Sequence, residues 1–562
     1  MKDRLIEPVY SLHRHARTSV SVMACLAVCF VGISMKAMAD GPVVLPSGHP
    51  LKALMIAGGC CHDYPNQNLI LSEGISQRAN VSWDFVLATD NSRAAKLPLY
   101  DDPNWIDGYD VVVHNECFGG MDDAQWLEKI AKAHETSGIP ALFVHCSLHS
   151  YRAAPTDAWR ILMGARSTSH EGHRPVKVEN LRPNHPVMKS FPATWDTPNG
   201  ELYKIEKMWP DAIPLAKAFG VDTQKDHVCV WLNHSGNARV FTTTLGHHNE
   251  TMSHPVYLDM VARGLLWATG KIESDGSPSP GFAPARPQTK NNERLILAAD
   301  YQKKRIALKS DSGEKLWEHP IRDIHDLQVL PNGNILFQTS WTHIVEVTPE
   351  GHTVWSYDAS KENGNEGKRI EVHAFQRLAN GLTMIAESGS RRIIEVDDHG
   401  KILREVPLKV DNPDAHRDTR MVRKTAGGHY LVAHEKDACI REYNPKGQVV
   451  WEYKTNHKTY GVNRLSNGNT IIGNGDGHNV LVVNPDGEVV WSLERNELPG
   501  ITLEWVTTVE ELPNGNYLIG NCHAGPDNPQ IIEVSPDKKV VWQFKDFDLF
   551  GNALPCSTVV IP

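Results

Sequence analysis

Two patterns of hydrophobic positions follow one another along this chain of 562 residues, and each predicts a different fold. In the first half, short apolar runs alternate with segments whose apolar residues recur at helical spacing. Strands are predicted at 51–57, 81–87, 110–114 and 141–144, with helices at 66–79 and 122–136. This alternation is typical of an α/β doubly wound parallel sheet, flavodoxin-like, with helices on both faces. Functional groups are expected at the carboxyl ends of its strands.

From residue 291 onward the sequence repeats itself, with two hairpin signals in each repeat. The first is a turn glycine, found at Gly333, Gly381, Gly428, Gly468 and Gly515. The second is a turn followed by a strand that ends in tryptophan, at Trp317, Trp355, Trp451, Trp491 and Trp542. Two hairpins make a four-stranded blade, and blades arranged around an axis make an all-β propeller. We expect the tryptophans to pack between blades.

The ends of this repeat region predict how the ring closes. The first repeat, which begins at Glu293, lacks an inner strand, and residues 557–562 resemble that missing strand. We therefore expect about six blades, with the C-terminal strand completing the first blade and removing an exposed sheet edge. A seventh, degenerate blade remains an alternative.

The N-terminus predicts export. Arg14 and Arg17 precede an apolar run at 20–33, and Ala37-Met38-Ala39 follow it. This is the order of a secretory signal, with cleavage expected after Ala39. The apolar run is shorter than the roughly 20 residues of a membrane span, so an anchor is the weaker interpretation. The mature protein is expected in the periplasm or outside the cell, without a membrane span.

Residues 274–290 are rich in Pro, Gly and Ser and predict a linker between domains at 40–273 and 291–562. The formal net charge of −10, with no basic stripe, argues against nucleic acid as a partner. Eight of the ten cysteines lie beyond the signal segment, and their spacing fits no zinc ribbon. Export would permit disulfides, but the pairing stays open, because several of these cysteines also lie in apolar strands where free thiols are common.

Several short motifs of the first domain, in their order and spacing, resemble the ThuA (trehalose utilisation) family, a branch of the class I glutamine-amidotransferase-like fold. They lie at 54–59, 110–116, 142–147, 161–164, 184–187, 201–203 and 239–251. The resemblance implies a sugar ligand, a disaccharide or a keto-sugar derivative. His145 stands on the turn where amidotransferases carry cysteine, so glutaminase chemistry is not expected. Gly200 replaces an aspartate that is common before the family's glutamate.

The candidate site of this domain is a set of histidines at strand ends, because one sheet edge gathers them. The catalytic residues are predicted to be His62, His114, His145, His170 and Glu201. Sugar-binding residues are predicted to be Glu116, His185, His247 and His248, with His149 in the same region. Imidazole suits proton transfer and ligation of a divalent metal, although no cofactor is assigned. For each histidine the alternative is a hydrogen-bonded structural role.

The second domain resembles PQQ-like and arylsulfotransferase-like propellers in its Gly-x-x-x-Trp hairpins. PQQ itself is not expected, since PQQ dehydrogenases have eight blades and a vicinal disulfide beside the quinone, whereas Cys60-Cys61 belong to the other domain. Aligning the repeats on their glycines superposes His325, His373, Arg420 and Tyr460 at the start of the inner strands. They predict a saccharide or anion site; the alternative is the polar lining of a solvated channel.

The function that these observations favour is an exported, sugar-processing enzyme of carbohydrate catabolism, whose propeller binds ligand or a protein partner. One alternative is a non-catalytic binding or assembly platform of the cell envelope. Another is a quinoprotein or sulfotransferase, which rests on fold analogy alone. The substrate, the reaction type and the oligomeric state cannot be read from the sequence.

Overall fold

The computed structural model describes residues 43–44, 49–284, 286–289 and 293–561. The expected signal segment, 1–39, lies outside the described residues, and its cleavage stays a prediction. Within the described ranges, no helix is long and apolar enough to cross a membrane. The short strand β1 (Val43–Val44) pairs antiparallel with β13 (Gln288–Thr289).

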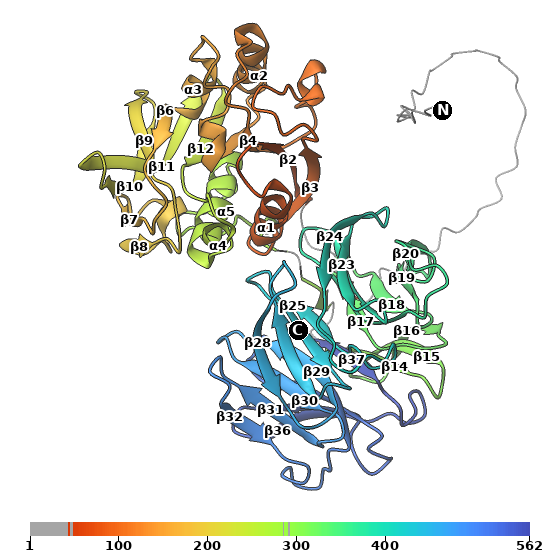
Figure 1. Cartoon of the computed structure of the whole chain (residues 1–562). Coiled ribbons are helices and arrows are strands. Elements are labelled where there is room, and N and C mark those ends of the chain that lie inside the picture. Colours follow the sequence, from red (N-terminus) through yellow and green to blue (C-terminus); the bar gives the residue numbers. More distant parts are fainter. Residues whose placement is uncertain (1–42, 45–48, 285, 290–292, 562) are drawn as a thin grey trace, which may run out of the picture. The chain divides into compact units, whose positions relative to one another are not determined.

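One mixed sheet of nine strands organises the described part of the first domain (Figure 1). In sheet order the strands are β3 (Val81–Leu87), β2 (Leu51–Gly59), β4 (Val111–Cys117), β5 (Ala141–Val144), β12 (Ala238–Thr243), β11 (Lys225–Ser235), β10 (Ile213–Gly220), β7 (Lys177–Asn180) and β8 (Thr194–Asp196). The first five run parallel, which confirms the predicted parallel sheet. From β12 to β8 the pairing is antiparallel, an extension that the sequence pattern did not predict.

Helices cover both faces of this sheet. The helices are α1 (Tyr64–Ser76), α2 (Ala124–Ser137), α3 (Ala158–Met163), α4 (Asn249–Met252) and α5 (Pro255–Thr269). Leu71 of α1 and Leu265 of α5 pack in the core on one face, and Leu127 of α2 and Leu162 of α3 pack in the core on the other. The two layers bury the central strands of the sheet.

Shorter elements stand around the sheet edge. A two-stranded sheet joins β6 (Ala165–His170) to β9 (Tyr203–Met208) and places His170 opposite Tyr203. Three 3-10 helices are η1 (Pro98–Asp101), η2 (His145–Leu148) and η3 (Pro186–Met188). Because η2 follows β5 directly, it begins at the carboxyl edge of the sheet.

Residues 293–561 form six four-stranded sheets, which confirms the propeller of six blades. From the inner to the outer strand, the blades are β37 (Cys556–Val560), β14 (Leu295–Asp300), β15 (Arg305–Ser310), β16 (Lys315–Pro320); β17 (Leu327–Val329), β18 (Ile335–Gln338), β19 (His343–Val347), β20 (Thr353–Asp358); β21 (Glu371–Arg377), β22 (Thr383–Ser388), β23 (Arg392–Val396), β24 (Ile402–Pro407); β25 (Val422–Lys424), β26 (Tyr430–His434), β27 (Cys439–Tyr443), β28 (Val449–Lys454); β29 (Thr459–Arg464), β30 (Thr470–Asn474), β31 (Asn479–Val483), β32 (Val489–Leu493); and β33 (Trp505–Glu511), β34 (Tyr517–Cys522), β35 (Ile531–Val534), β36 (Val540–Phe544).

The last strand closes the ring, as predicted. β37 pairs antiparallel with β14, from Leu295 opposite Val560 to Ala299 opposite Cys556. Strands from the two ends of the propeller sequence therefore make one blade. This pairing covers the inner edge of β14, which would otherwise present free backbone groups.

The recurrent tryptophans tie neighbouring blades together. Trp451 Nε1 donates to the Pro485 carbonyl of the next blade at 3.0 Å, and Trp491 Nε1 donates to the Pro536 carbonyl at 2.8 Å. Trp542 of the last blade donates to Asp311 of the first at 3.0 Å. The hairpin signature thus encodes both the blade and its contact with the next blade.

The first part of the predicted linker, 274–290, packs against the first domain. Phe282 packs against the first domain's core, and its carbonyl accepts a hydrogen bond from the Asn80 N–H at 2.9 Å. A β-bridge joins Ile272 to Pro278. The stretch up to Phe282 is therefore part of the α/β domain's surface.

Candidate active site

The turn after β5 presents the first candidate residue. His145 begins η2 in a left-handed backbone conformation with φ of 42°, which is uncommon for a residue with a side chain and clusters at functional sites. Its Nδ1–H donates to the Thr244 carbonyl at 2.5 Å, which leaves Nε2 as an acceptor. Burial lowers the pKa of His145 although the nearby Glu201 opposes this, so the ring is neutral at pH 7.

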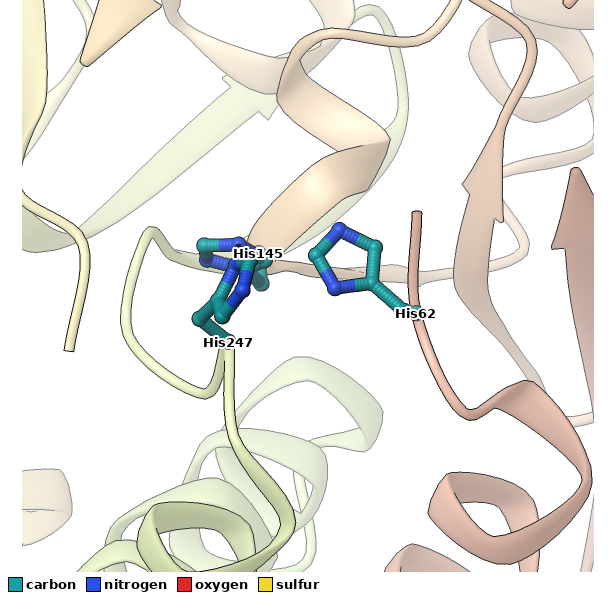
Figure 2. A group of neighbouring side chains, drawn as sticks. All are labelled: His62, His145 and His247. Atoms are coloured by element: carbon teal, nitrogen blue, oxygen red, sulfur yellow. Dashed lines mark hydrogen bonds between the residues drawn. The ribbon is translucent and has the colours of Figure 1, made fainter. Parts of the chain in front are cut away.

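Three histidines from three loops converge at this point (Figure 2). His62 follows β2, His145 follows β5, and His247 follows β12. The His145 Nε2 and His247 Nδ1 atoms lie 3.1 Å apart, and the His62 ring centroid lies 4.6 Å from that of His247. His62 Nδ1 is buried and has no hydrogen-bond partner among the described residues. Burial, and then the neighbouring histidines, lower the pKa of His62 to about 2, so the ring is neutral at pH 7 and one of its nitrogens has a free lone pair.

Glu201, just before β9, lies at the centre of the histidines. Its Oε2 is 3.4 Å from both His145 Nε2 and His247 Nδ1. Its Oε1 is 3.0 Å from His170 Nδ1 and from His173 Nε2. Burial opposes ionisation of Glu201, but its contacts with His145 and His247 outweigh burial and hold the pKa of this carboxyl far below its usual range. The site therefore carries a fixed negative charge.

A small cavity of 90 Å³ opens onto these groups, lined by His62, His149, Arg152, His170, Glu201 and Tyr203 among others. Tyr203 stacks on His149 with ring centroids 3.8 Å apart and points its hydroxyl at His145 Nε2, 3.3 Å away. Burial lowers the pKa of His149 to about 3. At about 30 Å³ per water, the cavity has room for about three waters or for one edge of a sugar ring.

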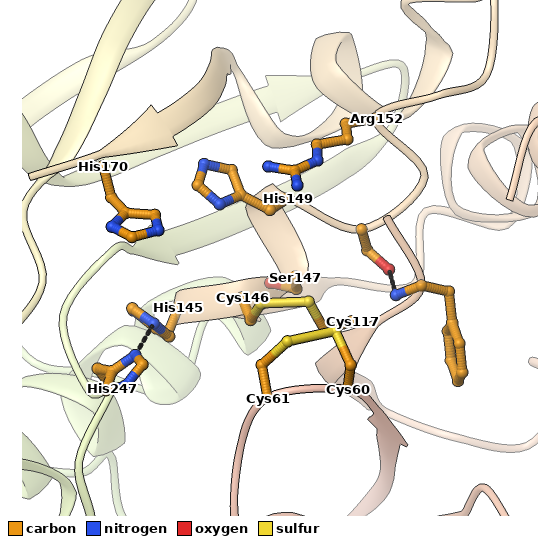
Figure 3. The surroundings of a disulfide bond; sticks show 12 residues. Cys60, Cys61, Cys117, His145, Cys146, Ser147, His149, Arg152, His170 and His247 are labelled. Carbon is orange, nitrogen blue, oxygen red and sulfur yellow. Dashed lines mark hydrogen bonds between the residues drawn. A yellow bond between two sulfur atoms is a disulfide. The ribbon is translucent and has the colours of Figure 1, made fainter. Parts of the chain in front are cut away.

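Two disulfides form the floor of this region (Figure 3). One joins the adjacent Cys60 and Cys61, and the other joins Cys117 of β4 to Cys146 of η2. Gly59, with φ of 98°, permits the close approach of β2 to Cys117, since a Cβ there would lie 2.2 Å from the Cys117 carbonyl oxygen. The four unpaired cysteines of the described residues are all buried: Cys229, Cys439, Cys522 and Cys556.

The arrangement fits a divalent metal ion. Ligand nitrogens of His62, His145 and His247 lie within 4.8 Å of one another. With metal–nitrogen bonds of about 2.0–2.1 Å, two nitrogens of a tetrahedral site are about 3.3 Å apart, close to the 3.1 Å between His145 and His247. The Thr244 carbonyl, which holds the His145 Nδ1–H, is the kind of outer contact that orients a metal-binding imidazole.

The structure places three of the predicted site residues elsewhere. His114 lies on the opposite face of β4 from Cys117, where it stacks on Phe143 and contacts Glu116 at 2.9 Å and His134 at 3.1 Å. The expectation that His114 shares the pocket is therefore wrong, because residues two apart in a strand face one side and their neighbours face the other. Glu116 lies on the same face of β4 as His114, outside the pocket, and accepts a hydrogen bond from the Tyr100 hydroxyl at 3.0 Å.

His185 also has a different position, since its Nδ1 accepts from the Val187 N–H and caps η3. His248 lies beside the group, with its ring 4.3 Å from His247, and contacts the Asn199 amide at 3.3 Å. His173, three residues after His170, contacts Glu201 but was not among the predicted site residues. The spacing His170-Glu171-Gly172-His173, with a glycine between the two histidines, was a signal that a turn here carries a histidine pair.

In the propeller, the structure brings together the four residues that the repeat alignment superposed. His325 Nδ1 contacts the Tyr460 hydroxyl at 2.6 Å, and Arg420 donates to His325 Nε2 at 3.2 Å. The rings of His325 and His373 are 4.5 Å apart. Whether they bind a saccharide stays a prediction.

Two family models match the chain. Residues 52–268 match the ThuA family, described as trehalose utilisation, and residues 302–544 match a family described as outer membrane protein assembly factor BamB. Among curated protein sequences, no match was found.

Solved structures similar to this chain each cover about half of it. A protein of unknown function from Bacteroides caccae is 24% identical, with a TM-score of 0.43, and the match covers 48% of this chain and 99% of that one. A ThuA-like protein from Parabacteroides merdae is 18% identical, with a TM-score of 0.34, covering 43% and 98%. A virginiamycin B lyase from Staphylococcus aureus is 13% identical, with a TM-score of 0.34, covering 46% and 86%.

Proposed function

Because residues 52–268 form a ThuA-like domain, we propose that this chain is a metal-assisted enzyme that acts on a disaccharide or a keto-sugar derivative. The observation that carries the proposal is the convergence of His62, His145 and His247 on one point beside the ionised Glu201. His62 Nδ1 is buried and unpaired within the part of the chain that the structure describes, which supports a metal there, since an unpaired buried polar atom costs about 1–3 kcal/mol.

The chemistry follows from the protonation states of the residues. A bound divalent ion would polarise a carbonyl or hydroxyl oxygen of the sugar. His145 and His62 are neutral and can ligate, while Glu201 supplies negative charge that offsets part of the metal's. His170 and His173 are about half exposed and contact Glu201, so they can exchange protons with solvent and with the substrate.

The size of the cavity limits what can enter it. A volume of 90 Å³ is well below the roughly 300 Å³ at which sites for drug-sized ligands begin. Only the reacting edge of a sugar would therefore reach the histidines, with the rest of the ligand outside. Arg152, which lines the cavity and donates to the Thr168 carbonyl at 2.9 Å, is placed to bind a hydroxyl of that edge.

Export to the periplasm or beyond is part of the same proposal. Two disulfides in the first domain support it, because disulfides persist in oxidising compartments. Intact-mass measurement on protein purified from the cell envelope should give a chain that begins at Asp40. A mass that includes Met1 would contradict cleavage after Ala39.

The test uses the full chain loaded with Zn²⁺ and offered 3-keto-glycosides and their parent disaccharides, with products followed by NMR. His145→Ala should abolish turnover and weaken metal binding while changing stability by only about 1–2 kcal/mol. The matched control is His185→Ala, which removes a cap of η3 and leaves the candidate site intact.

Two outcomes would contradict the proposal. A His145→Ala protein with full turnover would return the histidines to a structural role. A wild-type protein that binds sugars without metal and without turnover would favour the non-catalytic platform.

A further inference from the structure

A second histidine cluster lies in the propeller, separate from the residues of the ThuA-like domain. His325 precedes β17, His373 is in β21, and His416 lies in the loop between β24 and β25. Their ligand nitrogens lie within 4.8 Å of one another. Two of the three were prominent in the repeat alignment, whereas His416 lies in a long loop outside the repeat register.

His373 is held between two acceptors. Its Nδ1 lies 2.7 Å from the Thr419 carbonyl oxygen, and its Nε2 lies 3.2 Å from Oε2 of Glu371. A neutral imidazole has one N–H, so it can satisfy one of these contacts, and its other lone pair then faces an oxygen. A metal ion bound at Nε2 would remove this conflict.

His416 shares the same carboxylate. Its Nδ1 lies 2.6 Å from Glu371 Oε2, which leaves Nε2 as its remaining ring nitrogen. A carboxylate on one ring nitrogen and a metal on the other is the usual arrangement around metal-binding histidines. Glu371 is thus positioned to orient His416 and to compensate positive charge, while its Oε1 contacts Arg369 at 3.3 Å.

The remaining charges of the cluster are balanced. Arg420, which contacts His325 Nε2, is paired through its Nε with the buried Glu435. His325 uses its other nitrogen with the Tyr460 hydroxyl. For His325 to ligate, one of these two contacts has to give way, so His325 is expected to engage after His373 and His416.

A cavity of 450 Å³ adjoins the cluster. Its walls include Tyr301, Trp341, Tyr460 and Trp505, and His325 and His416 reach into it. The Trp341 ring lies 4.9 Å from His325 and 5.3 Å from His416. A metal ion held by three imidazoles keeps an open coordination position, and here a ligand there would lie between aromatic rings.

We propose that His325, His373 and His416, supported by Glu371, bind a divalent transition-metal ion with an open position toward this cavity. Imidazole donors select zinc, copper, nickel, cobalt or iron over calcium and magnesium. The ligand of the open position would be a small molecule with an oxygen or nitrogen donor and a ring that stacks on tryptophan.

The experiment measures Co²⁺ bound to the full-length chain after treatment with chelator and gel filtration, by elemental analysis and by visible absorption. A His62→Ala/His145→Ala background removes the candidate centre of the first domain. In that background one equivalent of Co²⁺ should remain, and adding His373→Ala should remove it. Adding Glu371→Gln instead should weaken Co²⁺ binding about 10–100-fold.

The matched control is His399→Ala, which changes a propeller histidine whose side chain is 86% exposed, and it should retain the ion. If His373→Ala fails to fold, His416→Ala is used for the test. The His416 side chain is partly exposed, so removing it creates little cavity and the protein should still fold. The proposal is overturned if the background binds no Co²⁺ at neutral pH, or if a folded His373→Ala or His416→Ala protein keeps it. If instead the first domain binds no metal, the wild-type protein and the His62→Ala/His145→Ala protein should both bind one equivalent of Co²⁺.

Discussion

At the scale of single residues, replacing His62 is expected to change the stability of the protein and its metal binding in opposite directions. Its Nδ1 is buried and meets no partner in the described ranges, and an apolar ring of similar shape would remove that unsatisfied atom. His62→Phe should therefore raise the stability of the metal-free protein by about 1 kcal/mol, measured by urea unfolding, and should abolish metal binding to the first domain. His399→Phe on the propeller surface is the control and should change neither. A His62→Phe protein that is less stable and still binds metal would contradict the assignment.

Histidines that are buried and neutral also make the stability of the protein depend on pH. Burial lowers the pKa of His134, and separately that of His149, to about 3, whereas both take up a proton near pH 6.5 when unfolded. Between these values the unfolded chain binds more protons, so stability falls as pH falls from about 6.5 to 3. Each group contributes about 1.4 kcal/mol per pH unit in that window. The urea midpoint should follow this slope, and His134→Leu should make it shallower; an unchanged slope would exclude His134 as a contributor.

At the scale of elements, β37 decides whether the ring is closed. It covers the edge of β14 over five residue pairs, and Cys556 packs with Leu295 and Leu297 in one core cluster. Deleting residues 557–562 should lower the melting temperature of the propeller by several degrees and promote aggregation through the exposed edge, as followed by calorimetry and light scattering. Val490→Ser, at an exposed position of the outer strand β32, is the control. An unchanged melting temperature after the deletion would mean that the closure does not contribute to stability.

At the scale of the whole molecule, the repeats and the strand–helix alternation were enough to predict both folds. The tryptophan hairpins predicted blades because each repeat must bury the same faces, and the unpaired start of the first repeat predicted its partner. The site was predicted less well. His145 and Glu201 lie in motifs, but His114 lies on the other face of its strand, and the sequence of β4, which is buried on both faces, gives no alternation by which to tell them apart. His173 and His416 reach their sites from loops, where periodicity carries no information, and Glu371 begins β21 two residues before the aligned His373.

The pairing of β14 with β37 also has a consequence for how the protein is made. Leu295 is synthesised long before its partner Val560, and five complete blades are synthesised in the interval. The first blade therefore stays incomplete until these five blades and β37 have been synthesised. A chain cut short before β37 has an open ring and a bare strand edge, which proteases and chaperones recognise in misfolded proteins. The architecture thus makes closure of the ring depend on the synthesis of β37, at the cost of the slow folding that such distant pairings bring.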